Sequence, residues 1–199
     1  MSGAAAGAAR ADARSGAPVL DLRPRGRRLG LKGPGAGAWL ETHGLPIPPV
    51  PNGWLLAAAG DAGVLVARLG SSEYFLEQGG EGAQLAALER ELTAAPPGVY
   101  PVLREDRVVE LVGAGVYAAL AEVSGIDYAR REDAARTVVM TLMAGIAVLV
   151  IIYGTTEAPA VRIWCDPTYG PALIEHLTTV VTESGGQVLA DEQTLGETA

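Results

Sequence analysis

The chain has 199 residues, a formal net charge of −8 and an apolar share of 49%, enough for one ordinary domain or two small ones with a real core. The acidic balance argues against a nucleic-acid-binding surface, because phosphate binding needs clustered Lys and Arg. The single cysteine, Cys165, excludes an internal disulfide and a multi-cysteine zinc site, and it fits a reducing cytoplasm.

The chain begins with a stretch of small and polar residues. Residues 1–17 contain no continuous apolar run, so we expect a disordered tail rather than an export signal. A basic run comes next, formed by Arg23, Arg25, Arg27, Arg28 and Lys32. We interpret it as a solvated segment or as a docking patch for an acidic partner surface.

The strongest internal signal is a repeat at an offset of 80 residues. The segment LKGPGAGAWLETHGL, which starts at Leu31, aligns with LVGAGVYAALAEVSGI, which starts at Leu111, and Gly33 meets Gly113. In each copy the pattern predicts a short strand, then a glycine-rich turn, then a helix of about ten residues. Glycine at this corner permits a sharp turn and a close backbone approach.

Further extended segments and a second helix follow the corner in each copy. In the first half we expect a helix at 84–93 and strands at 28–32, 53–58, 64–69, 73–77 and 99–103. In the second half we expect a helix at 168–183 and strands at 108–112, 137–142, 146–153, 160–165 and 187–190. Asp166 is the expected cap of the last helix, with Pro167 at its first position.

One segment, 138–153, is apolar enough to need a membrane test. Its 16 residues fall short of the roughly 20 that a bilayer-spanning helix requires. Its β-branched residues, with Ala144 and Gly145 near the middle, indicate two buried strands joined by a tight turn.

The order of elements predicts an α+β fold of two tandem ferredoxin-like (split βαβ) units related by the internal repeat. We expect a first unit at 18–104, a second unit at 105–190, and a C-terminal tail at 191–199. The proline-rich stretch 45–51 is interpreted as a stiff connector, with a PxxP ligand as the less favoured alternative.

Two glycine-rich corners are the first candidates for chemistry. The corner at 33–37 opens a helix whose N-terminus could hold an anion, but it lacks the Lys-Ser/Thr ending of a P-loop. The equivalent glycines recur in the second copy, where Val112 replaces Lys32. Packing therefore explains these glycines better than ligand binding.

The remaining polar candidates are isolated. His43 and His176 have no partner at metal-binding spacing, so we expect structural or surface roles. Cys165 precedes the capping Asp166, where a helix N-terminus would lower its thiol pKa, but we favour a buried strand residue. The mixed-sign runs at 89–91 and 130–133 are interpreted as solvated faces. We therefore predict no catalytic residue and no metal site, and we assign no cofactor-binding residue.

Five segments occur in a familiar order: RRLGLKGPGAGAWLETHGLPIPPVPNGW, VARLGSSEYFLE, PGVYPVLRED, TVVMTLMAGIAVLVI and VRIWCDPTYGPALIEHL. Over residues 28–186 the chain resembles the gamma subunit of heterotetrameric sarcosine oxidase. The resemblance implies a fold similar to part of the aminomethyltransferase (glycine-cleavage T-protein) family, which has folate-binding members. It also implies a noncatalytic, cytoplasmic subunit that holds no flavin.

The resemblance further implies a complex that oxidatively demethylates sarcosine to glycine and passes the one-carbon unit to tetrahydrofolate. FAD, FMN and NAD would belong to the larger subunits, and the partners would be alpha and beta flavoprotein subunits with a small delta subunit. The T-protein group places a carboxylate near the folate nitrogens, and no Asp or Glu here aligns with it. Lys32 is the one motif position with a chemically useful side chain.

Two alternatives to the sarcosine oxidase reading stay open. The first is a gamma-like subunit of N-methylglutamate dehydrogenase or of another N-methyl amine oxidoreductase. The second is a stand-alone folate-binding protein. The second is disfavoured because such proteins resemble one another in a KGCYxGQ motif, whereas Cys165 stands in WCDPT.

Overall fold

A computed structural model describes residues 16–23, 26–57, 63–130, 136–155 and 157–190. They form two compact units, which we treat separately. The N-terminal unit comprises Arg25–Glu105 with Arg136–Val138, and the C-terminal unit comprises the first 24 residues, Asp106–Ala135 and Val139–Ala199. The tails expected at 1–17 and 191–199 lie outside the described residues, apart from Gly16 and Ala17.

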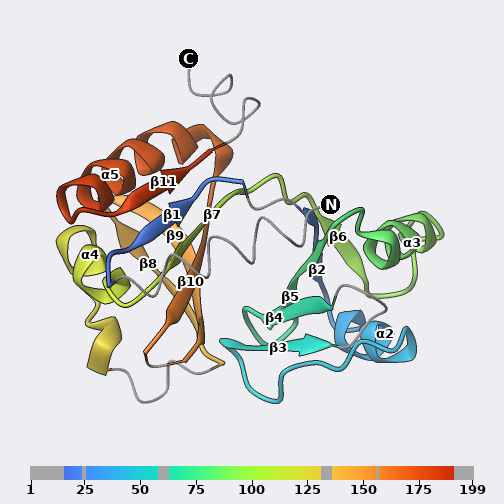
Figure 1. Cartoon of the computed structure of the whole chain (residues 1–199). Coiled ribbons are helices and arrows are strands. Elements are labelled where there is room, and N and C mark those ends of the chain that lie inside the picture. The colour runs from blue at the N-terminus through green and yellow to red at the C-terminus, as the bar shows by residue number, and fades with distance from the viewer. Residues whose placement is uncertain (1–15, 24–25, 58–62, 131–135, 156, 191–199) are drawn as a thin grey trace. The chain divides into compact units, whose positions relative to one another are not determined.

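The N-terminal unit is a five-stranded antiparallel sheet with two helices on one face (Figure 1). Its elements are β2 (Gly26–Lys32), α2 (Ala36–Thr42), β3 (Gly53–Ala57), β4 (Val64–Arg68), β5 (Glu73–Gly79), α3 (Ala83–Leu92) and β6 (Tyr100–Val102). The strand order is β3-β4-β5-β2-β6. Alternate strand residues such as Leu31 and Leu76 pack against Leu40 and Leu85 of the helices and form the core.

The C-terminal unit has a six-stranded sheet in the order β11-β1-β7-β10-β9-β8. Its elements are β1 (Val19–Asp21), β7 (Arg107–Val112), α4 (Val116–Val123), the 3₁₀ turn η2 (Tyr128–Arg130), β8 (Val138–Met143), β9 (Ile146–Gly154), β10 (Pro159–Cys165), the 3₁₀ turn η3 (Pro167–Tyr169), α5 (Gly170–Glu183) and β11 (Gln187–Leu189). Buried residues of the sheet, including Val161 and Ile163, form one core with Leu120 of α4 and Leu177 of α5.

The strand β1 corrects the expected boundary at residue 18. It pairs antiparallel with β7 and parallel with β11, so it belongs to the C-terminal unit. Leu20 is fully buried in that unit's core, and the Leu22 amide donates to the Leu189 carbonyl at 2.8 Å. Sequence reasoning missed it because a three-residue strand shows no readable alternation.

The apolar segment 138–153 forms two adjacent strands, β8 and β9, as predicted. Ala144 and Gly145 both have positive φ, at 49° and 80°, which is the geometry of a tight hairpin turn. The Ala144 amide donates to the Val123 carbonyl at 2.7 Å and so ties the turn to the end of α4. No helix within the described ranges is long and apolar enough to cross a membrane.

The two strand-to-helix corners have matching backbone geometry. Gly33 and Gly113 have φ values of 119° and 111°, a region that only glycine adopts readily. Ala36 donates to the Gly33 carbonyl at 3.1 Å, and Val116 donates to the Gly113 carbonyl at 3.2 Å. The aligned glycines therefore make the same turn in each unit.

The proline-rich connector 45–51 is fixed by a single arginine. Nη1 of Arg68 donates to the carbonyls of Pro48 and Pro49 at 3.3 and 3.0 Å, and Nη2 donates to Ser71 at 3.1 Å. Leu45 at the start of the connector is fully buried. These contacts hold segment 45–51 within the N-terminal unit, in agreement with its interpretation as a connector.

Candidate functional site

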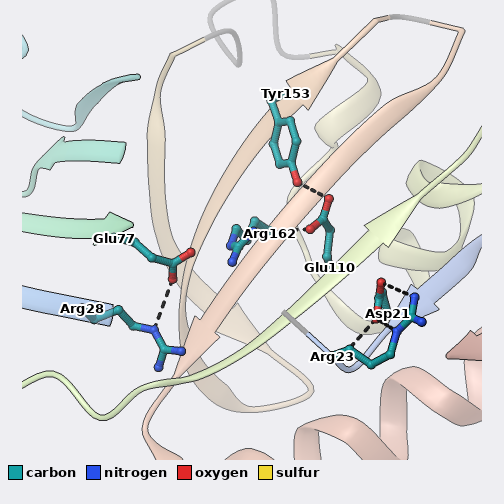
Figure 2. A network of polar contacts seen from close by, with 7 residues as sticks. All are labelled: Asp21, Arg23, Arg28, Glu77, Glu110, Tyr153 and Arg162. Carbon is teal, nitrogen blue, oxygen red and sulfur yellow. Dashed lines mark hydrogen bonds and ion pairs between the residues drawn. The ribbon is translucent and has the colours of Figure 1, made fainter. Parts of the chain in front are cut away.

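Each sheet has a face opposite its helices, and a buried ion pair crosses two neighbouring strands on that face. In the N-terminal unit Arg28 of β2 lies directly opposite Glu77 of β5. The Arg28 Nε donates to Glu77 Oε2 at 3.2 Å, with the side chains only 14% and 6% exposed (Figure 2). A carboxylate this buried requires a partner, so the pair stabilises the fold only while both members are present.

The C-terminal unit carries a related cluster. Here the acidic residue lies on the strand that leads into the glycine corner, β7, whereas in the N-terminal unit the basic residue lies on that strand, β2. Glu110 of β7 lies directly opposite Arg162 of β10, with 3.4 Å between Nη1 and Oε2. The Tyr153 hydroxyl of β9 donates to Oε1 of the same carboxylate, and the Arg162 guanidinium lies 5.8 Å from the Trp164 ring centre. Figure 2 shows Tyr153 and Arg162 converging on Glu110.

The chemistry of this cluster is set by burial. Desolvation raises the pKa of Tyr153 above its ordinary value, and the charge and hydrogen bond of Glu110 raise it further, against a smaller opposing effect of Arg162. Tyr153 therefore stays a neutral hydrogen-bond donor at physiological pH. The carboxylate engages a phenol and a guanidinium, an arrangement that suits structural support better than proton transfer.

The basic run is distributed over separate acidic partners. Asp21 accepts from Arg23 through both carboxylate oxygens, at 2.8 and 2.9 Å. Arg27 pairs with Glu89 at 2.5 Å, and the Arg28 side chain is the buried one described above. Neither a solvated segment nor a docking patch describes Arg28. Arg25 lies outside the described residues, and Lys32 is exposed.

Cys165 is a buried strand residue at the end of β10, as favoured from the sequence. Desolvation raises its thiol pKa to about 11, aided by the charges of Asp106 and Asp166 and opposed by Arg107. The effect of burial outweighs any effect of the following helical turn. A neutral thiol is a poor nucleophile, so Cys165 is not poised for covalent chemistry.

Asp166, the residue after Cys165, caps a helical turn as predicted, but that turn is a 3₁₀ turn and not the first turn of α5. Asp166 Oδ1 accepts from the Thr168 amide at 2.8 Å. The Thr168 side chain and then this amide lower the pKa of Asp166. Pro167 opens the 3₁₀ turn η3, and α5 continues from Gly170. The observed cap therefore serves a 3₁₀ turn that leads into the helix.

The corner at Gly33–Gly37 is filled by backbone rather than by space for an anion. A Cβ on Gly33 would lie 2.3 Å from the Gly98 carbonyl oxygen, and one on Gly35 would lie 2.6 Å from that of Pro97. The Gly35 amide already donates to Gly98 at 2.9 Å. Carbonyl oxygens repel anions, so the packing interpretation of these glycines is confirmed.

The two histidines differ in their surroundings. His176 is an exposed residue of α5, whereas the His43 ring contacts the Trp39 carbonyl and the Glu91 carboxylate. Among the residues that the structure describes, no group of three His, Cys, Asp or Glu side chains could hold a metal ion. Of the mixed-sign runs, Arg130 pairs with Asp127 at 3.5 Å on the surface, and 131–133 lie outside the described ranges.

Sequence reasoning missed the two buried pairs that cross the strands. Glu77, Glu110 and Arg162 are charged residues within largely apolar strands, a signal that marks them as partnered. Their partners follow only from the strand register, which the sequence alone leaves open.

Comparison with known proteins shows which solved structures have a similar fold. No known protein family and no curated protein matches the sequence. Among solved structures, a chain of heterotetrameric sarcosine oxidase from Corynebacterium sp. U-96, in complex with pyrrole 2-carboxylate, is 22% identical with a TM-score of 0.67. The match covers 94% of this chain and 97% of that chain.

A second similar structure is the glycine cleavage system aminomethyltransferase T from Bartonella henselae. It is 16% identical with a TM-score of 0.65, and the match covers 88% of this chain and 49% of that one. The chain thus spans about half the length of the aminomethyltransferase. Its mixed α+β fold, with two sheets, is the fold that a chain of heterotetrameric sarcosine oxidase shares with aminomethyltransferase T.

Proposed function

We propose that the chain is the noncatalytic, gamma-like subunit of a heterotetrameric sarcosine oxidase-like complex. The observation that carries this proposal is the reciprocal coverage: the match takes in 94% of this chain and 97% of a chain from a heterotetrameric enzyme. The sequence motifs from GLKGPGA to WCDPT, which resemble those of the gamma subunit, support the same assignment.

The polar clusters support a structural role for this subunit. The Arg28–Glu77 pair and the Glu110–Tyr153–Arg162 cluster consist of buried groups that bind one another. Cys165 is buried with a raised pKa, which removes the most reactive side chain type from consideration. In this proposal FAD, FMN and NAD reside on the alpha and beta subunits, which with a delta subunit are its cytoplasmic partners.

The two units of the chain are, in this proposal, copies of one split βαβ motif. The order β6-β2-β5-β4 in the N-terminal unit places the fourth, first, third and second strands of that motif side by side. The equivalent strands β7, β10 and β9 keep the same neighbours in the C-terminal unit. The matching glycine corners support the same internal repeat.

A folate-binding role is the second candidate, because the fold is also that of an aminomethyltransferase. In that case the chain would bind tetrahydrofolate by itself or complete a folate chamber of the complex. Coverage of only 49% of the aminomethyltransferase favours completion of a site over an independent one.

The deciding experiment is co-expression of the chain with the large-subunit genes beside its own, followed by purification through a tag on this chain. We expect a yellow assembly that oxidises sarcosine, with flavin absorbance lost when the large subunits are omitted. Assembly with large subunits that oxidise N-methylglutamate instead would favour the dehydrogenase alternative. A colourless monomer that binds tetrahydrofolate in isothermal titration calorimetry would overturn the subunit proposal.

A further inference from the structure

His43, at the end of α2, lies between two hydrogen-bond acceptors. Its Nδ1 is 2.6 Å from the Trp39 carbonyl oxygen, and its Nε2 is 2.6 Å from Glu91 Oε2 on α3. A neutral imidazole has one N–H, so it can donate to only one of these oxygens. Both contacts are satisfied together only when the ring is protonated and carries two N–H groups.

Two further features of the surroundings favour a cation at this position. The ring centres of His43 and Trp39 lie 4.2 Å apart, so the imidazolium is placed against an aromatic ring that attracts positive charge. His43 is also the C-cap of α2, where the helix dipole presents its negative end. Accordingly, the backbone hydrogen bond to Trp39 raises the pKa of His43, and the hydrogen bond and charge of Glu91 raise it further, against desolvation.

We propose that His43 is a proton-dependent latch between α2 and α3, in which the protonated ring joins the Trp39 carbonyl to the Glu91 carboxylate and deprotonation breaks one of the two links. This inference rests on the contacts within the N-terminal unit and is independent of the proposed function. It assigns His43 a role that the comparisons do not.

The neighbouring charges leave Glu91 as the acidic partner of the latch. The other titratable groups on the elements around His43 are Glu41 on α2, Glu73, Tyr74 and Glu77 on β5, Arg27, Arg28 and Lys32 on β2, and Glu89 and Arg90 on α3. Glu77 pairs with Arg28 on the face of the sheet opposite the helices. Glu89 is occupied by Arg27 at 2.5 Å, and the Arg90 Nε donates to the Ala86 carbonyl at 3.3 Å. Within the described part of the unit, the carboxylate at bonding distance from His43 is that of Glu91.

The sign of the pH dependence follows from the raised pKa. A group whose pKa is higher in the folded protein stabilises the fold most when it is protonated in both states. The latch is therefore complete below the ordinary histidine pKa and is lost as pH rises through the raised pKa of His43.

The test is an NMR titration of the His43 ring in the full chain. We expect His43 to titrate above the ordinary histidine pKa. Glu91→Gln keeps an acceptor oxygen but removes the charge, and it should lower the pKa of His43 relative to the unsubstituted chain. His176→Gln assigns the signals and should leave His43 unchanged.

Hydrogen exchange supplies a second readout. Protection factors of amides in α2 and α3 should fall as pH rises through the His43 titration, while those of α4 and α5 should not follow it. His43→Gln should abolish this dependence. If His43 titrates at the ordinary histidine pKa and Glu91→Gln does not move it, or if protection in α2 and α3 is independent of His43 ionisation, the latch does not exist.

Discussion

The two units differ in the strand that lies beside the strand leading into the glycine corner, which is β2 in one unit and β7 in the other. In the N-terminal unit that neighbour is β6, which follows α3 in the chain and pairs antiparallel with β2. In the C-terminal unit the equivalent neighbour of β7 is β1, which also pairs antiparallel. The last strand, β11, is displaced outward by one place and pairs parallel with β1.

In each unit the glycine corner packs against the segment that leads into this neighbouring strand. Gly35 packs against the Pro97 carbonyl on the way into β6, with 2.6 Å to a Cβ built on the glycine. The equivalent Gly115 packs against Pro18, on the way into β1, with 2.7 Å to the Pro18 Cδ. The corner thus packs against a segment that follows it in the chain in the N-terminal unit and against one that precedes it in the C-terminal unit.

The largest expected effect comes from the two buried ion pairs. Glu77→Ala removes the buried carboxylate to which Arg28 donates and should cost about 3 kcal/mol of the free energy of unfolding. Glu110→Ala should cost less, about 2 kcal/mol, because its cluster is more exposed. Urea denaturation measures the free energy of unfolding of both variants.

The matched control is Glu73→Ala. Glu73 is 47% exposed and lies 3.6 Å from Arg104, so its loss should cost at most about 0.5 kcal/mol. A Glu77→Ala variant no less stable than Glu73→Ala would show that the burial of the pair has no energetic weight.

The second prediction concerns the strand that distinguishes the units. Leu20→Ala in β1 removes a fully buried side chain and should destabilise the C-terminal unit by about 3 kcal/mol. Val102→Ala in β6 truncates a half-buried side chain and should cost about 1 kcal/mol. Denaturation monitored by hydrogen exchange in β7 and β2 tests the difference. If the two substitutions lower the free energy of unfolding equally, β1 contributes no more to the stability of its unit than β6 does.

The third prediction addresses the corners themselves. Gly35→Ala and Gly115→Ala each introduce a Cβ closer than 3.0 Å to a neighbouring group, so each should destabilise its own unit by about 2 kcal/mol. Gly125→Ala is the control, since its Cβ would meet open space, and it should change stability by no more than about 0.5 kcal/mol. Thermal unfolding compares the three. If the three variants unfold at the same midpoint temperature, the close packing at the corners does not contribute to stability.

The smallest effect is expected at Cys165, which can report on the C-terminal unit without a change in stability. With a thiol pKa of about 11, it should react slowly with alkylating reagents at neutral pH and faster as pH rises towards that value. Leu20→Ala should speed the labelling by loosening the shared core, and Gly125→Ala should not. Labelling at the rate of a free thiol in the native chain would contradict the buried position.

Sequence reasoning reached the helices and most strands because their alternation and glycine corners are local signals. It missed β1, whose partners β7 and β11 lie far along the chain. It also missed Gln78, whose Oε1 accepts from the amides of Gln84 and Leu85 at 3.0 and 3.2 Å. That side chain starts α3 from the preceding strand, in place of a residue at the cap position.

The candidate site was less accessible to prediction than the fold. Cys165 was correctly interpreted as a strand residue, and the corner glycines as packing. The partners of Arg28, Glu110 and Tyr153 depend on strand register and burial, which arise only after the sheet has formed.

The position of β1 between β7 and β11 also sets an order of assembly during synthesis. β1 is synthesised before either of its partner strands, β7 and β11, and most of the N-terminal unit lies between β1 and β7 in the chain. The C-terminal sheet can therefore reach its final strand order only after β11 has been made. A chain truncated before β11 would hold β1 on one side only, against β7.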